Sequence, residues 1–117
     1  MSMSSKEMAK TAYQSLSEKK ADDIKIIDIS GISVLADYFI IADGSNQHQI
    51  EAMCDAVEED LFKAGVPVKQ KEGNRNSSWI LMDYGDIIVH VFSKEHRLFY
   101  DLERIWGDGK FIDISEL

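Results

Sequence analysis

The side chains of this sequence that could act as nucleophiles are Ser45 and Cys54. Ser45 follows Gly44 where a predicted strand meets a predicted helix, but no Gly-x-Ser-x-Gly elbow surrounds it, so helix capping accounts for it. Cys54 falls on the apolar stripe of that helix, which favours a buried structural thiol over a reactive one. The three histidines lack the i, i+4 spacing or Cys-x-x-Cys company typical of metal ligands. These histidines are His48, His90 and His96. We therefore expect no catalytic residue, no cofactor and no metal.

Gly44-Ser45, between a buried strand and a helix, resembles the entry motif of nucleotidyltransferases. In enzymes of that superfamily, a following strand carries a pair of carboxylates, and this pair binds two metal ions. Here the acids that follow Ser45, among them Asp55 and Asp60, fall on a predicted helix, and Asp83 and Asp86 flank a predicted turn. Two-metal phosphoryl transfer thus lacks its ligands. A resemblance of fold without the chemistry is favoured, and a nucleotidyltransferase-like nucleotide-binding protein or enzyme is the alternative.

The charge and composition of the chain indicate which kinds of partner and which cellular location to expect. Thirteen basic residues against 21 acidic ones give a formal net charge of −8 over 117 residues. Phosphate backbones need a basic footprint, so little direct contact with nucleic acid is expected. The acidity either maintains solubility or forms a surface that meets a basic protein. No stretch is long enough to span a membrane. The single cysteine and the absence of a signal or transit peptide predict a cytoplasmic protein.

A predicted β-hairpin, residues 77–92 (SSWILMDYGDIIVHVF), organises the chain. A Gly in a short polar break between β-branched and aromatic runs is typical of a hairpin turn. With Tyr84 and Gly85 as the loop, Trp79 pairs with His90. The face that carries Trp79 also carries His90, Leu81, Ile88, Asp83 and Asp86. We expect function on this face, because a core alone does not demand a Trp, a His and two acids there.

The other predicted elements complete a mixed-sheet α+β domain in the order α-β-β-α-β-β-β-α. Apolar stripes predict helices over residues 4–20, from 45 or 46 to 64, and 93–106. Apolar runs predict strands over residues 24–29, 37–42 and 66–71, the last at an edge of the sheet because it holds Pro67. A single domain over residues 1–117 is expected, with its core at about 24–106 and a tail at 107–117.

Four consecutive motifs carry a resemblance to a known family. They read DYFIIADGSNQHQ, EGNRNSSW, LMDYGDIIVHVF and HRLFYDLERIW, and they lie between about residues 24 and 106. In these motifs the chain resembles the Iojap family of ribosomal silencing factors (RsfS). The resemblance implies a small α/β domain of nucleotidyltransferase-like fold that is not known as catalytic. It also implies binding to the large ribosomal subunit through ribosomal protein number fourteen, which blocks joining of the small subunit and represses translation.

The resemblance also implies which residues bind that partner. Apolar contact is expected from Trp79, Met82 and Tyr84. Acidic contact with basic side chains of the ribosomal protein is expected from Asp83, Asp86 and Glu72. Arg97 and Tyr100 are further candidates, with anchoring of the last helix to the sheet as the alternative. Tyr84, at the tip of the predicted hairpin, is expected to be exposed. A homodimer that uses the apolar hairpin face as its seam is a further alternative.

Overall fold

The computed structural model describes residues 3–31, 34, 36–73, 79–93 and 110–117. Their helices and strands, in chain order, are α1 (Ser5–Glu18), β1 (Asp22–Asp28), β2 (Tyr38–Gly44), α2 (Gln47–Lys63), β3 (Gln70–Glu72), β4 (Trp79–Asp83), β5 (Ile87–Ser93), β6 (Lys110–Ile112) and the 3-10 helix η1 (Ile114–Glu116). The predicted helix over residues 93–106 falls almost entirely outside the described residues.

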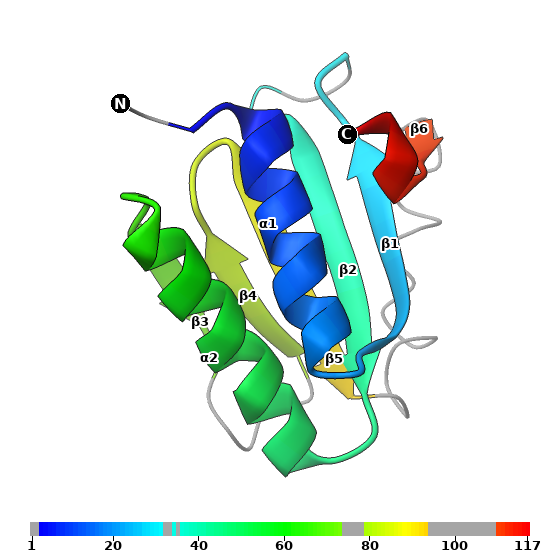
Figure 1. Ribbon diagram of the computed structural model, residues 1–117, viewed down its shortest axis with the longest axis vertical. Coiled ribbons are helices and arrows are strands. Elements are labelled where there is room, and N and C mark those ends of the chain that lie inside the picture. Colours follow the sequence, from blue (N-terminus) through cyan, green and yellow to red (C-terminus); the bar gives the residue numbers. More distant parts are fainter. Residues whose placement is uncertain (1–2, 32–33, 35, 74–78, 94–109) are drawn as a thin grey trace.

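The strands form one mixed sheet in the order β3-β4-β5-β2-β1-β6. β5 runs parallel to β2, and the other neighbouring strands are antiparallel. Both helices lie on one face of this sheet, side by side (Figure 1). β2 is buried along its whole length, as the continuous apolar run predicted. The α+β prediction with a mixed sheet is confirmed.

Both helices begin with the local signals that the sequence carries. The hydroxyl of Ser4 accepts a hydrogen bond from the backbone N–H of Glu7 at 3.2 Å and caps α1. The side chain of Asn46 accepts from the N–H of Gln49 at 2.8 Å and caps α2. Gly65 follows the end of α2 with φ of +89°, the left-handed conformation predicted for a helix cap.

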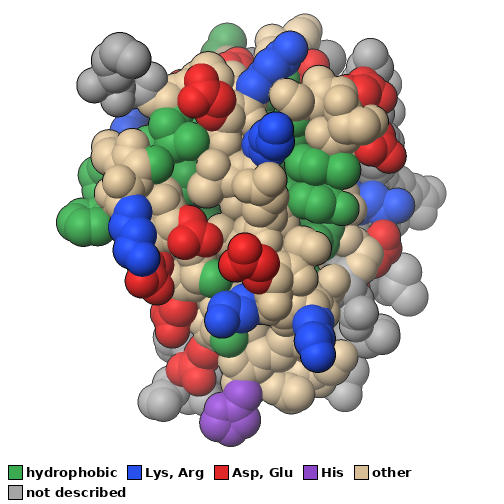
Figure 2. All heavy atoms as spheres, viewed as in Figure 1, with side chains coloured by type: hydrophobic (Ala, Val, Ile, Leu, Met, Phe, Trp, Pro, Cys, Tyr) green, Lys and Arg blue, Asp and Glu red, His purple; other side chains and the backbone are tan. Residues whose placement is uncertain are grey.

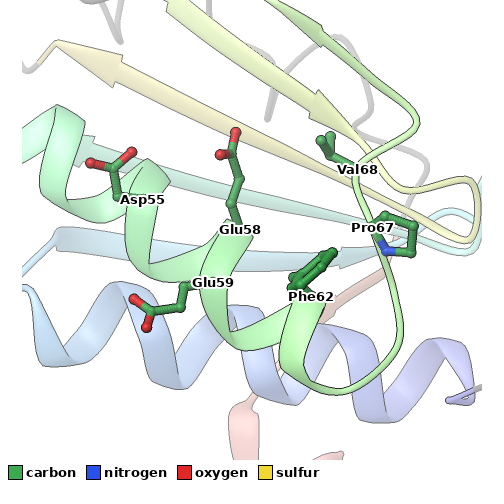
Figure 3. A pocket seen from close by; sticks show the side chains of 6 residues that line it. All are labelled: Asp55, Glu58, Glu59, Phe62, Pro67 and Val68. Carbon is green, nitrogen blue, oxygen red and sulfur yellow. The ribbon is translucent and has the colours of Figure 1, made fainter.

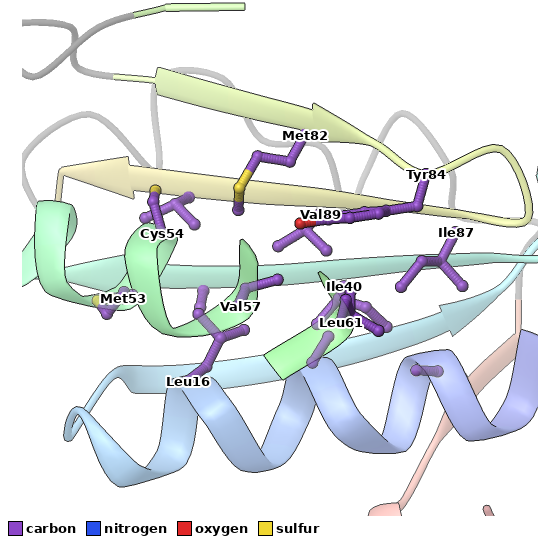
Figure 4. Close-up of a cluster of buried hydrophobic side chains, with 14 of the residues drawn as sticks. Leu16, Ile40, Met53, Cys54, Val57, Leu61, Met82, Tyr84, Ile87 and Val89 are labelled. Atoms are coloured by element: carbon purple, nitrogen blue, oxygen red, sulfur yellow. The ribbon is translucent and has the colours of Figure 1, made fainter. Parts of the chain in front are cut away.

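The first core lies between the helices and the sheet. α1 contributes Ala12 and Leu16, and α2 contributes Met53, Val57 and Leu61, all fully buried. These residues pack on the alternate side chains of β2, β4 and β5 that face the helices (Figure 4). The hydroxyl of Ser15 on α1 also donates to the carboxylate of Asp60, which ties the two helices together.

The second core lies on the sheet face that points away from the helices. It consists of Ile27, Ile29, Ala36, Phe39, Ile41 and Phe92, with Trp79 and Ile88 packed against it. Adjacent residues such as Ile26 and Ile27 belong to different cores because successive side chains of a strand point to opposite faces. The central strands are therefore apolar on both faces.

Gly44 marks a close approach of β2 to α2. A Cβ atom added there would lie 2.8 Å from Cγ1 of Ile50 and 3.2 Å from Sδ of Met53, and both side chains are buried. The Gly of the Gly44-Ser45 motif therefore has a packing role in this fold.

Replacing Gly44 with Ala is expected to lower the free energy of unfolding by about 2 kcal/mol, because the added methyl group overpacks this junction. Urea unfolding followed by circular dichroism measures the change. Gly31→Ala is the matched control, since nothing lies within 4 Å of a Cβ atom added at Gly31. Equal stability of the two variants would contradict the packing role.

The predicted hairpin exists, but its register differs by two residues. Trp79 pairs with Phe92 rather than His90, and His90 pairs with Leu81. The backbone N–H of Tyr84 donates to the carbonyl of Ile87 at 3.0 Å, which leaves Gly85 and Asp86 as the loop. Gly85 has φ of +89°, and a glycine at the first loop position permits the tight turn. The predicted loop of Tyr84 and Gly85 was wrong.

Two further predictions about the sheet were inaccurate. The edge strand β3 covers Gln70–Glu72 rather than residues 66–71, because Pro67 has no N–H to contribute to a ladder. Its position at the edge was correct. Residues 110–112, predicted as part of a tail, form β6, which pairs with β1 along Ile26–Asp28. The predicted limit of the core at about residue 106 was therefore too short.

Candidate functional site

Three neighbouring strands build a surface on the sheet face that points away from the helices. Directly paired residues of antiparallel strands point to the same face, and the register pairs Glu72 with Leu81 and Asp83 with Ile88. With Asp86 in the adjoining loop, these residues and Trp79 form what we call the hairpin surface: Glu72, Trp79, Leu81, Asp83, Asp86 and Ile88. Glu72 and Asp86 are exposed, and the other four are half-buried. The surface thus combines apolar side chains with carboxylates.

Trp79 is held in place by a buried histidine. Its indole N–H donates to Nδ1 of His90 at 3.1 Å. The Trp79 ring also stacks on the ring of Phe92, with 5.5 Å between the centroids and 17° between the planes. Phe39 contacts His90 edge-on at a centroid distance of 4.7 Å. These contacts fix the orientation of a half-buried Trp, and a fixed aromatic side chain loses little entropy on binding a partner.

His90 is neutral at physiological pH. It is 3% exposed, and burial lowers its pKa to about 4. Because Nδ1 accepts the hydrogen bond from Trp79, the single ring proton lies on Nε2. Nε2 is buried and has no hydrogen-bond partner in the described part of the chain. The imidazole therefore acts as an acceptor for Trp79 and not as an acid or a base.

The turn of the hairpin is braced by a carboxylate. Oδ1 of Asp83 accepts from the backbone N–H of Gly85 at 2.8 Å. The backbone carbonyl of Asp86 accepts from the N–H of Asp37 at 2.8 Å and ties the loop to the start of β2. The side chain of Lys69 lies close above Gly85, with Nζ at 2.7 Å from the position of an added Cβ. The turn presents Asp86 from a fixed backbone.

Two of the apolar residues predicted to bind a partner lie in the core instead. Met82 is fully buried and Tyr84 is 2% exposed, so neither side chain is available at the surface. Both point toward the helices, among Val57, Leu61 and Val89 (Figure 4). Strand alternation explains the result. Met82 and Tyr84 each follow a residue of the hairpin surface, Leu81 and Asp83, so their side chains point to the opposite face of the sheet. The expected exposure of Tyr84 was wrong.

The structure brings the other predicted residues together in part. Trp79, Asp83 and Glu72 share one face, and Asp86 lies in the loop beside it. Arg97 and Tyr100 lie outside the described residues. Strand alternation placed Leu81 and Ile88 on this face, where both are half-buried, but they were not named among the partner-binding residues.

The residues considered for catalysis are engaged in structural roles. Cys54 is 2% exposed, and burial raises its pKa to about 12, so it stays a neutral thiol as predicted. The backbone N–H of Ser45, at the start of α2, donates to Oε1 of Gln49 at 2.6 Å. Gln49 in turn donates from Nε2 to the carbonyl of Lys20 at 2.8 Å. The described residues contain no group of three or more His, Cys, Asp or Glu side chains that could hold a metal ion.

The described fold and its hairpin surface define a small α+β domain with an apolar and acidic face suited to binding a protein. A family model described as "Ribosomal silencing factor during starvation" (RsfS) matches residues 2–117. The chain is 38% identical over 113 residues to the ribosomal silencing factor RsfS of Bacillus subtilis, covering 97% of this chain and 96% of that protein. It is 32% identical to the chloroplastic protein Iojap of Arabidopsis thaliana, over 92% of this chain and 43% of that protein.

Solved structures agree with these relatives. A crystal structure of a protein from Chromobacterium violaceum has a TM-score of 0.85 at 36% identity, over 90% of this chain and 88% of that chain. One from Bacillus halodurans has a TM-score of 0.81 at 31% identity, over 92% of this chain and 97% of that chain. The chain belongs to the RsfS family, as the sequence motifs indicated. This membership supports a role in silencing translation at the ribosome. No helix among the described residues is long and apolar enough to cross a membrane.

Proposed function

We propose that this protein silences translation by docking on the large ribosomal subunit through ribosomal protein number fourteen. Occupancy of that site blocks association with the small subunit. The observation that carries the proposal is the hairpin surface, where Trp79 is oriented by His90 and shares a sheet face with the carboxylates of Glu72 and Asp83. Aromatic anchors with a polar rim are typical of protein interfaces, and ribosomal proteins are basic partners for an acidic surface. With the ribosome as its partner, the protein is proposed to act in the cytoplasm.

The proposed action is steric and requires no catalysis. The bound domain needs only an affinity high enough to compete with subunit joining. The formal net charge of −8 steers it toward basic protein rather than toward the phosphates of ribosomal RNA. The alternative of nucleotide binding at Gly44-Ser45 gains no support, because the backbone N–H of Ser45 already donates to Gln49.

Sucrose-gradient sedimentation of purified ribosomal subunits with the protein tests the proposal. Co-migration with the large subunit and a lower yield of joined ribosomes are expected. Migration only at the top of the gradient would reject the proposed docking. Light scattering of the free protein separates the alternative, a homodimer that buries the hairpin surface, from a monomer that presents it.

Trp79→Ala is expected to weaken binding to the large subunit by roughly 30-fold, which corresponds to about 2 kcal/mol for loss of an aromatic anchor. Equilibrium binding to labelled large subunits measures the loss, and circular dichroism verifies the fold of the variant. Tyr13→Ala, which truncates a half-buried aromatic residue on α1, is the control and is expected to bind normally. Unchanged affinity of a folded Trp79→Ala protein would show that the hairpin surface is not the docking site.

A further inference from the structure

A groove of about 360 Å³ lies on the other side of the sheet, between α2 and the chain that leads into β3. We call it the α2 groove, and Figure 3 shows the side chains that line it: Asp55, Glu58, Glu59, Phe62, Pro67 and Val68. We propose that the α2 groove is a second docking surface, which binds a basic segment of a partner protein. This inference goes beyond the proposed docking on the large subunit and does not depend on it.

The apolar part of the groove is exposed to solvent, which is unfavourable in free energy. Phe62 is 69% exposed and, with Val34, is one of two exposed large hydrophobic residues in the described part of the chain. Its ring lies beside Pro67 and Val68, which come from the segment after α2 (Figure 3). An aromatic residue at the end of an otherwise polar helical stripe contributes nothing to the first core. A partner side chain that covers Phe62 and Val68 would remove this apolar surface from water.

The wall of the groove on α2 is acidic. Asp55, Glu58, Glu59 and Phe62 follow the i, i+3, i+4, i+7 spacing, so their side chains share one stripe of the helix. The whole helix carries one lysine, Lys63, against the carboxylates of Glu51, Asp55, Glu58, Glu59 and Asp60. Figure 2, viewed from the helical side, shows acidic side chains gathered with few bases at this margin of the molecule. The electrostatic potential here favours a cationic ligand.

Two lysines form ion pairs with two of the carboxylates that line the groove, and the remaining carboxylate is available to a partner. Nζ of Lys71, on β3, lies 2.8 Å from Oε1 of Glu58, and Nζ of Lys63 lies 3.0 Å from Oε1 of Glu59. Asp55 is exposed and forms no ion pair with any described residue. It lies one helical turn from Glu58 and Glu59, at the end of the groove opposite Phe62 (Figure 3). A cationic side chain of the partner is therefore best placed beside Asp55.

These features specify the occupant as a polypeptide with an apolar side chain flanked by lysine or arginine. The apolar side chain covers Phe62 and Val68, and the base meets Asp55. A nucleic acid is disfavoured because its phosphates would face the carboxylates. A second copy of this chain is disfavoured because each copy carries a net charge of −8 and like charges repel.

An NMR titration of the isolated protein tests the inference. The probe is a short synthetic peptide of alternating lysine and leucine, and the matched peptide has glutamate in place of lysine. We expect saturable amide shifts confined to residues 55–63 of α2 and to residues 68 and 69, and none with the glutamate peptide. Shifts that fail to saturate up to about 1 mM peptide, or equal shifts with both peptides, would overturn the proposal.

Two pairs of variants locate the effect. Phe62→Ser is expected to weaken peptide binding at least about tenfold, because it removes the apolar contact. Phe62→Leu keeps an apolar side chain and is expected to retain most of the affinity. Both variants are expected to fold, since Phe62 is exposed. Asp55→Lys is expected to weaken binding more than Glu18→Lys, which makes the same change of charge at an exposed position on α1. Equal losses of peptide affinity in these two lysine variants would mean that only the net charge of the protein matters, and would reject the α2 groove as the binding site.

Sedimentation of the free protein excludes the competing occupant. A dimer that dissociates on dilution and is abolished by Phe62→Ser would assign the groove to a second copy of the chain and overturn the proposal. The titration contains no ribosome, so its outcome is independent of docking on the large subunit. Loss of peptide binding and loss of subunit binding are therefore distinguishable.

Discussion

Tyr84→Ala is expected to lower the free energy of unfolding by about 4 kcal/mol. Tyr84 is 2% exposed and packs in the first core, so its truncation leaves a cavity the size of an aromatic ring between the sheet and the helices. Because Tyr84 follows β4 and its backbone N–H closes the turn onto Ile87, loss of its packing also weakens the turn at Gly85. Urea unfolding of the variant and the parent protein, followed by circular dichroism, measures the difference.

Tyr84→Phe is the matched control and isolates the hydroxyl group. The hydroxyl oxygen is buried and has no hydrogen-bond partner in the described part of the chain. Burial also raises the pKa of Tyr84, so the group stays neutral. Removing a buried polar group without a partner costs no hydrogen bond, and we expect Tyr84→Phe to be as stable as the parent protein or more stable. A large loss in Tyr84→Phe, or none in Tyr84→Ala, would contradict the burial of this ring.

This result bears on any binding experiment at the hairpin. A Tyr84→Ala protein that fails to bind the large subunit will have lost its fold, since about 4 kcal/mol is a large part of the stability of a domain of this size. Trp79→Ala, which truncates a half-buried side chain on the opposite face, is the informative variant. The stability of both proteins must be measured before their affinities are compared.

Acidification is expected to destabilise the protein through His90 by about 3 kcal/mol between pH 6.5 and pH 4. In the unfolded chain a histidine takes up a proton below its ordinary pKa of 6.5, whereas burial holds the pKa of His90 at about 4 in the folded state. The unfolded state therefore binds more protons in this interval, and the free energy of unfolding falls as the pH falls. The stabilisation is complete above pH 6.5 and is lost as the pH approaches 4.

Carboxylates also titrate in this range, so the contribution of His90 is obtained by difference. Urea unfolding at several pH values is compared for the parent protein and His90→Gln, and the variant is expected to lose the steep part of the dependence. His48→Gln, at an exposed histidine, is the control and should follow the parent. A direct NMR titration in which His90 of the folded protein is protonated near pH 6.5 would refute the lowered pKa.

The amino-acid sequence by itself determined both described α-helices, the four longer strands β1, β2, β4 and β5, and the faces of their side chains. Apolar spacing and the cap at Asn46 located α2, and the same spacing placed Cys54 in the core, because helical periodicity is a local property of the chain. Strand alternation placed Trp79, His90 and Asp83 on one face. The motifs around the hairpin also sufficed to indicate the family, which the relatives then established.

Only the tertiary structure decided the register between the strands and the contacts between distant parts of the chain. A register shift of two residues keeps every side chain on its face, since the period of a strand is two, and alternation cannot distinguish one such register from the next. The shift moved Tyr84 out of the loop and into the core, where α2 covers it. The bond from Trp79 to His90 and the pairing of β6 with β1 likewise join residues far apart in the chain. Such contacts depend on the packing of the whole fold, and no local pattern encodes them.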